Sequence, residues 1–115
     1  MFSLPSYAGW TRVVADTEGN THYVDFDRIR KQDGYVYFWS ITNYVKPSPD
    51  GHLSAKVYRQ VDCKLFRDKY LNSSYYTEPM GRGRPSLVSN KPDKDWRYPS
   101  PNSTIETTLK SICTK

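Results

Sequence analysis

Short apolar stretches separated by polar turns fill the first two thirds of the chain. Residues that favour turns, such as Gly19-Asn20 and Asp33-Gly34, stand between these stretches. The stretches themselves are rich in β-branched and aromatic residues, which favour strands over helices. We predict strands at Trp10–Val14, Thr21–Asp25, Tyr35–Val45, Ser54–Asp62 and Leu65–Tyr76, with a sixth, short edge strand at Leu87-Val88.

The strongest strand signal is the stretch Tyr35–Val45, where apolar and aromatic residues begin on both faces. This pattern predicts a central strand that is covered on both sides at its start. In Ser54–Asp62 the apolar residues alternate with polar ones, except that Arg59 interrupts the apolar face. We interpret the polar residues 27–34 as a connector before the central strand.

The last third of the chain divides into a long loop and a helix. Residues 77–101 hold five prolines and few apolar residues, which predicts a long loop that is either functional or a cover. Ser103 and Glu106 then form a capping-box pattern at the start of a helix over residues 103–113. Its apolar positions are Ile105, Leu109, Ile112 and Cys113, which share one helical stripe. The fold class is therefore α+β: a single antiparallel sheet of five to six strands with a C-terminal helix packed on one face.

Length and composition bound the fold without naming a function. The 115 residues are enough for one domain, residues 1–115, with a small core. Aromatic residues make up 15% of the chain and ten residues are Tyr, which suits sheets that are partly exposed. A net charge of +5 is compatible with binding nucleic acid or other anionic partners, and equally with simple solubility. No apolar run is long enough to span a membrane, and no signal peptide is visible.

The chain has two cysteines, Cys63 in the middle and Cys113 in the predicted helix. They could form a disulfide, take part in a metal or catalytic site, or be two separate buried thiols. A bridge would hold down a helix that is too short to be stable alone, and would contribute roughly 4 kcal/mol to stability. We therefore expect a disulfide and an oxidising, extracytoplasmic compartment.

The residues give little support to catalysis or cofactor binding. Neither cysteine has a local signature that pairs it with a histidine, and no zinc spacing is present. His22 and His52 are expected to be surface histidines. We expect no enzyme activity, no metal and no cofactor. A small basic domain rich in aromatic residues could instead bind single-stranded nucleic acid, which is the alternative function.

Several short motifs, taken in order, resemble one known family. They include "HYVDF", "DGYVYFWSITNY", "DCKLFR", the pair Tyr75-Tyr76, "MGRG", Trp96 and the late Cys113. Together they span nearly the whole chain, and it is similar to the surface-adhesin protein E family of bacterial extracytoplasmic proteins. The resemblance implies an antiparallel sheet whose C-terminal helix is tethered by a disulfide between Cys63 and Cys113. It also implies a non-enzymatic binding module located in the periplasm, on the outer-membrane surface or outside the cell.

The partner implied by the resemblance is an extracellular or cell-envelope protein. The founding adhesin binds host-matrix and serum proteins such as laminin, vitronectin and plasminogen. An anionic polymer and a homodimer are further expectations, whereas nucleic acid is not favoured. Recognition is expected through a sheet face or the basic loop, because a Trp among cations is a typical interface hot spot. The candidate contacts are Arg82, Arg84, Lys91, Lys94, Trp96 and Arg97.

Overall fold

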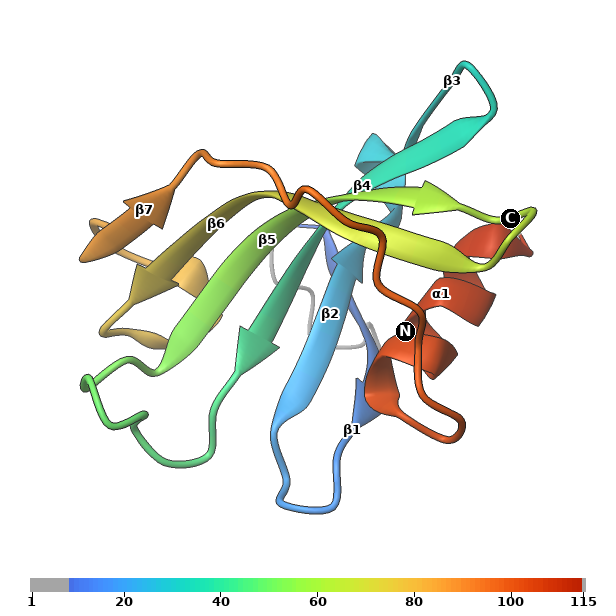
Figure 1. Ribbon diagram of the computed structural model, residues 1–115. Coiled ribbons are helices and arrows are strands. Elements are labelled where there is room, and N and C mark those ends of the chain that lie inside the picture. The colour runs from blue at the N-terminus through green and yellow to red at the C-terminus, as the bar shows by residue number, and fades with distance from the viewer. Residues whose placement is uncertain (1–8, 115) are drawn as a thin grey trace, which may run out of the picture.

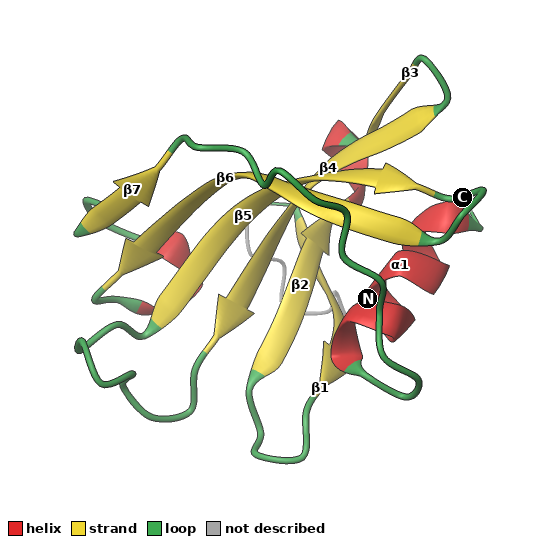
Figure 2. Ribbon diagram, in the orientation of Figure 1, coloured by secondary structure: helices red, strands yellow, loops and turns green. Residues whose placement is uncertain are grey.

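A computed structural model describes residues 9–114. The expectation that no signal peptide is visible concerns the first residues of the chain, most of which lie outside the described range. Ten short elements follow one another, and strands account for most of them (Figures 1 and 2). The strands are β1 (Trp10–Ala15), β2 (Thr21–Asp25), β3 (Arg30–Gln32), β4 (Tyr35–Asn43), β5 (Ser54–Asp62), β6 (Arg67–Tyr76) and β7 (Leu87–Ser89).

The strands form one antiparallel sheet in the order β1-β2-β4-β5-β6-β7, and β3 pairs with the beginning of β4. Two short 3-10 helices, η1 (Phe26–Arg28) and η2 (Pro79–Gly81), connect strands. The predicted antiparallel sheet is confirmed, and β4 lies in its middle as its two apolar faces indicate. The strand that the sequence did not predict is β3, which we interpreted as connector. Its residues are all exposed, so no apolar pattern marks it.

The helix α1 (Thr104–Cys113) begins where the capping pattern predicts. The Ser103 hydroxyl accepts a hydrogen bond from the Glu106 N–H at 3.2 Å. The Glu106 carboxylate reaches back one residue further than in the usual capping box and accepts from the Asn102 N–H at 3.0 Å. Both contacts satisfy backbone donors near the start of the helix.

The main core lies between α1 and one face of the sheet, which we call the helix face. Leu109 and Ile112 of α1 are almost completely buried, and they pack against Val24, Phe38 and Val61 of β2, β4 and β5. These three strand residues point to the same side because side chains alternate along each strand. A smaller cluster on the opposite side contains Tyr23, Ile41 and Met80.

The disulfide joins Cys63, directly after β5, to Cys113 at the end of α1. The two Cα atoms are 5.6 Å apart, and both residues pack against the core under the helix. The predicted bridge is therefore confirmed, and the alternatives of a metal ligand or two separate thiols are excluded for this pair.

Residues 77–101 follow the edge of the sheet for much of their length. Strand β7 pairs with the end of β6, close to the predicted edge strand at Leu87-Val88. Further on, Asp68 and Arg97 exchange two backbone hydrogen bonds of 2.9 and 2.8 Å. The Asp93 N–H donates to the Tyr70 carbonyl, and the Tyr70 N–H donates to the Asp93 carboxylate, each at 2.9 Å. Figure 1 shows this segment in orange as it runs from β7 to α1.

Candidate functional site

The side of the sheet opposite α1 carries a continuous group of aromatic and cationic side chains. Alternation places Tyr35, Tyr37 and Trp39 on this side of β4, because Val36 and Phe38 point to the helix core. The antiparallel register puts residues of β5 and β6 beside them. We call this surface the aromatic face and define it by Trp10, Arg30, Tyr35, Tyr37, Trp39, Lys56, Tyr58, Arg67, Lys69 and Trp96.

Cations and rings alternate in the part of the aromatic face over β4 and β5. The Lys56 ammonium lies 4.9 Å from the centre of the Trp39 ring and 5.9 Å from that of Trp10. Trp39 in turn contacts Tyr58, with ring centres 4.7 Å apart. At the other end of β4, the Arg30 guanidinium lies 4.9 Å above the Tyr37 ring. Each such cation–ring contact is worth about 0.5–2 kcal/mol, depending on its exposure.

Trp96 extends this surface from the long segment before α1. Its ring centre lies 4.4 Å from the Arg67 guanidinium, 4.7 Å from the Lys69 ammonium and 5.6 Å from the centre of the Tyr35 ring. The backbone pairing of Arg97 with Asp68 fixes the neighbouring residue beside β6, so the indole comes from the loop onto the sheet. The side chain remains partly exposed.

The charges on the aromatic face are only partly neutralised. Arg67 forms an ion pair of 2.9 Å with Asp62. Burial raises the pKa of Asp62, but the hydrogen bonds from the Leu65 N–H and Arg67 outweigh it and hold that pKa below its ordinary value. Burial between two indoles lowers the pKa of Lys56, and the nearby Arg28 acts in the same direction. A partly desolvated cation next to rings is suited to binding an anion or the edge of another ring.

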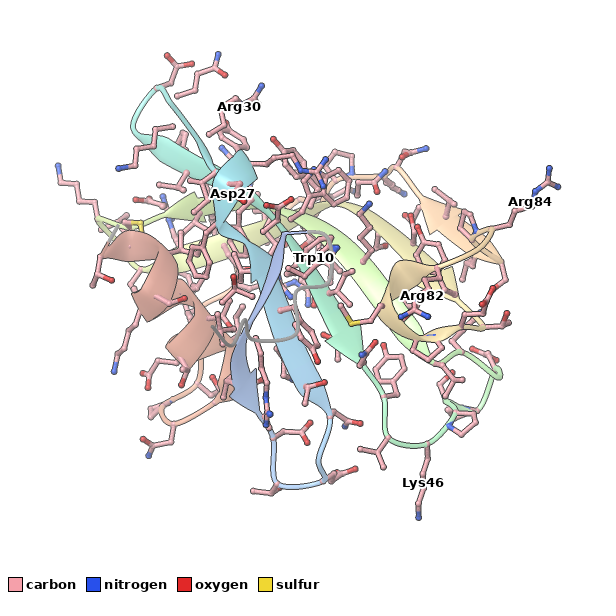
Figure 3. All side chains as sticks on the ribbon, turned by 180° about the vertical axis from the view of Figure 1, so that it is seen from behind. Trp10, Asp27, Arg30, Lys46, Arg82 and Arg84 are labelled. Carbon is pink, nitrogen blue, oxygen red and sulfur yellow. A yellow bond between two sulfur atoms is a disulfide. The ribbon has the colours of Figure 1, made fainter. Side chains whose placement is uncertain are left out.

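The six contact residues expected from the sequence do not form one cluster. Arg82 and Arg84 follow η2, which contacts the end of β4 at Asn43, whereas Trp96 contacts Tyr35 at the start of the same strand. Figure 3 shows Arg84 projecting away from the ribbon. Lys91 and Lys94 are exposed, and Arg97 is turned towards the ring of Tyr70. Of the six residues, only Trp96 belongs to the aromatic face. The role of the six residues in binding stays a prediction.

Sequence reasoning did not select the cations that surround Trp96. Arg67 and Lys69 share one face of β6, and Lys56 shares that face on β5. Their alternation with core positions marks them only as exposed strand residues. Their position next to Trp96 depends on the path of the segment 77–101, where the local sequence indicates only the short edge strand at Leu87-Val88.

The two histidines differ from the expectation of surface histidines. His52 is 8% exposed, its ring centre lies 5.5 Å from that of Tyr75, and its Nε2 lies 2.6 Å from the Ser86 hydroxyl. His22 is partly buried on β2, with its Nδ1 3.0 Å from the Thr42 hydroxyl. Both predictions of a surface position were wrong because tertiary contacts from β4, β6 and residue 86 cover the two rings.

Within residues 9–114, no group of three or more His, Cys, Asp or Glu side chains could hold a metal ion. In the same part of the chain, no helix has the length and apolar character needed to cross a membrane.

Comparisons with known proteins place these features in a family. Residues 10–114 match the model of a family described as surface-adhesin protein E. One crystal form of protein E from Haemophilus influenzae is 22% identical, with a TM-score of 0.72 over 96% of this chain and 91% of that chain. Protein E from non-typeable Haemophilus influenzae is 21% identical, with a TM-score of 0.66 over 97% of this chain and 80% of that chain.

A search of curated protein sequences gave no match. The family match covers almost all described residues, and the two structures share the fold of a sheet with a C-terminal helix. The chain belongs to the surface-adhesin protein E family.

Proposed function

We propose that the chain is a non-enzymatic binding module that recognises a protein or an anionic polymer through its aromatic face. An adhesin or binding role is implied by the family, and the aromatic face is the surface that supports it best. The observation that supports the proposal most is the position of Trp96, whose ring contacts Arg67, Lys69 and Tyr35 together. Partly exposed Trp, Tyr and Arg side chains are the residues most often found at binding hot spots.

We place this function outside the cytoplasm. The adhesin family and the disulfide both suggest an extracytoplasmic location, since disulfides persist in oxidising compartments. The periplasm, the outer-membrane surface and secretion are the locations we propose. The resemblance provides host-matrix proteins as the first protein partners to test, and the cations of the aromatic face provide anionic polymers as the second.

The test is a binding measurement with laminin and vitronectin as protein probes and heparin as an anionic polymer. We expect saturable binding to at least one probe by the wild-type chain. Trp96→Ala and Lys69→Glu should each weaken that binding at least about tenfold, because they remove a central ring and reverse a neighbouring charge. Circular dichroism and urea unfolding check that both variants remain folded.

Two charge-matched variants show which surface is used. Lys46→Glu changes a cation that projects from the loop after β4, away from the labelled Trp10 (Figure 3), and should leave binding unchanged. Arg84→Glu tests the other predicted surface, the basic loop. If Arg84→Glu abolishes binding and Lys69→Glu does not, the aromatic face is not the recognition surface.

Single-stranded nucleic acid remains the alternative, because interleaved rings and cations also suit stacked bases. A titration with oligothymidylate at several salt concentrations separates the two functions. Tight binding with a steep negative salt dependence would favour nucleic acid. Absence of binding at low salt would exclude it.

A further inference from the structure

A polar cavity of about 320 Å³ lies on the helix face, away from the aromatic face. One wall is formed by residues of β2, β4, β5 and β6, and the other by the segment 97–105 and by α1. The volume falls at the lower end of the range typical for small-molecule sites. Its two walls come from segments that are distant in sequence and that the fold brings together.

Arg59 is the fixed cation of this cavity. Its Nε donates to the Ser40 hydroxyl at 3.1 Å, and one terminal nitrogen donates to the Asp68 carboxylate at 2.9 Å. The side chain is 11% exposed and cannot move far without breaking these contacts. A guanidinium has five N–H donors, and these two contacts use two of them.

A second arginine, Arg97, also contacts the ring of Tyr70. The guanidinium carbons of Arg59 and Arg97 lie 4.6 and 4.2 Å from the Tyr70 ring centre, and all three residues line the cavity. Arg97 is held by Asp93 through Nε at 2.9 Å. The cavity thus has one buried and one half-exposed arginine, both held in place by acids.

Hydroxyl groups supply hydrogen-bond acceptors on both walls. The Thr108 hydroxyl donates to the Thr104 carbonyl at 2.9 Å, and the Ser103 hydroxyl donates to the Ser100 carbonyl at 2.7 Å. Ser40, Ser103 and Thr108 all line the cavity. A hydroxyl donates once and accepts through two lone pairs. The Ser40 and Ser103 oxygens already accept from the Arg59 Nε and the Glu106 N–H, so each retains one lone pair for a ligand.

The charge of the walls favours a ligand with a single negative charge. Asp68 and Asp93 each balance one of the arginines, and the beginning of α1 adds a partial positive charge. Burial lowers the pKa of His22; the charge of Asp16 raises it, and the charge of Arg59 lowers it. The pKa remains below its ordinary value of 6.5, so this imidazole is neutral at neutral pH. One carboxylate suits this environment better than a doubly charged phosphate does.

We propose that this cavity binds a small polyhydroxylated carboxylate of the size of a uronic acid. The carboxylate accepts hydrogen bonds from the free donors of Arg59 and Arg97, and the hydroxyl groups of the ligand donate to the Ser and Thr oxygens. This site is independent of the aromatic face and of the function proposed for it.

The test is a titration of the ¹⁵N-labelled chain with glucuronate, with glucose as the matched neutral sugar. Glucuronate should give saturable shifts at Thr42, Arg59 and Tyr70, with a Kd at or below about 1 mM, and glucose should give none. A disaccharide ending in glucuronate separates the two sources: binding of both forms indicates the end of a glycan, and binding of the free acid alone indicates a free metabolite.

Two variants locate the site. Ser100 is exposed at the cavity, and only its backbone carbonyl contacts Ser103, so Ser100→Trp should block entry and leave the fold intact. Arg59→Lys keeps the charge but loses the planar fork. Ser100→Trp and Arg59→Lys should each weaken glucuronate binding at least about tenfold. Thr107→Trp, on the exposed side of α1, is the control and should leave the affinity unchanged. Equal shifts with glucose, no saturable shift, or wild-type affinity in Ser100→Trp would overturn the proposal.

Discussion

At the scale of single residues, Arg59 and Asp68 form the most buried ion pair in the part of the chain that the structure describes. Their side chains are 11% and 2% exposed, and the atoms that pair lie 2.9 Å apart. Burial raises the pKa of Asp68, while Arg59 acts in the opposite direction. Each partner therefore depends on the other, since an isolated charge in this position would lack compensation.

Substituting one member of this pair should destabilise the fold strongly, whereas substituting both members together should not. Arg59→Leu leaves the Asp68 carboxylate buried without its partner, and we expect it to lower the free energy of unfolding by about 3–5 kcal/mol. Arg59→Leu combined with Asp68→Leu removes both charges and should recover most of that loss. Urea unfolding of the three chains provides the measurement. A double variant that is less stable than Arg59→Leu would contradict this account of the pair.

The sequence indicated Arg59 only as an interruption of an apolar strand face. That position is now explained, because the charge lies on the helix face and is neutralised by Asp68 from β6. The partner could not be predicted from the sequence, since the strand expected at Leu65–Tyr76 begins only at Arg67, and its register with β5 depends on the turn between them. The sequence marks Trp96 as a residue among the cations of its own loop, whereas its neighbours in the structure, Arg67 and Lys69, come from a strand earlier in the chain.

At the scale of elements, the periodicity of apolar residues predicts the strands and the helix that have a buried face, but it does not reveal elements whose residues are all exposed. Five strands and α1 were recognised because their apolar positions repeat at strand or helix spacing. Strand β3 escaped because Arg30, Lys31 and Gln32 are all exposed. Apart from the edge strand at Leu87-Val88, the segment 77–101 has no strand pattern, because its contacts with β6 are made by the backbone and by Asp93, which no side-chain pattern reveals.

Asp93 should determine how firmly this segment is held along β6. In Asp93→Ala, the backbone N–H groups of Tyr70 and Arg97 should exchange faster with solvent, because the carboxylate accepts from the Tyr70 N–H and from the Arg97 side chain. Hydrogen exchange measured by NMR follows each amide. Lys94→Ala, at an exposed neighbouring position, is the control and should leave both rates unchanged.

The same contact has a defined pH dependence. Burial raises the pKa of Asp93, but the hydrogen bonds from Arg97 and from the Tyr70 N–H outweigh it and keep the pKa below its ordinary value of 3.8. A carboxyl with a lowered pKa stabilises the fold above the unfolded value, and this contribution is lost as the pH falls through the folded value. The exchange rates of wild type and Asp93→Ala should therefore differ fully above about pH 3.8 and converge only as the pH falls further, through the lowered pKa of the folded state.

At the scale of the whole molecule, the disulfide joins the sheet to its only long helix within residues 9–114. The two cysteines are 50 residues apart in sequence, so the bridge closes a long loop of the unfolded chain. A crosslink of this length contributes roughly 4 kcal/mol in the chain-entropy model. We propose that residues 1–115 form one domain, with the bridge as a substantial part of its stability.

Removal of the bridge should therefore lower stability without changing the sheet. Cys63→Ser with Cys113→Ser should lower the free energy of unfolding by roughly 4 kcal/mol, with α1 loosening first because it is short. Urea unfolding gives the difference, and the far-ultraviolet spectrum reports the loss of helix. Thr107→Ala, at an exposed position of α1, serves as the control. An unchanged urea midpoint in the double variant would show that packing alone holds the helix.

The disulfide also has a consequence for how the chain matures. The two cysteines within residues 1–115 allow only one intramolecular pairing, and so no wrongly paired isomer of this part of the chain can accumulate. Oxidation therefore needs an electron acceptor but no rearrangement of bridges. Production of the folded protein should depend on a thiol oxidase and be indifferent to a disulfide isomerase.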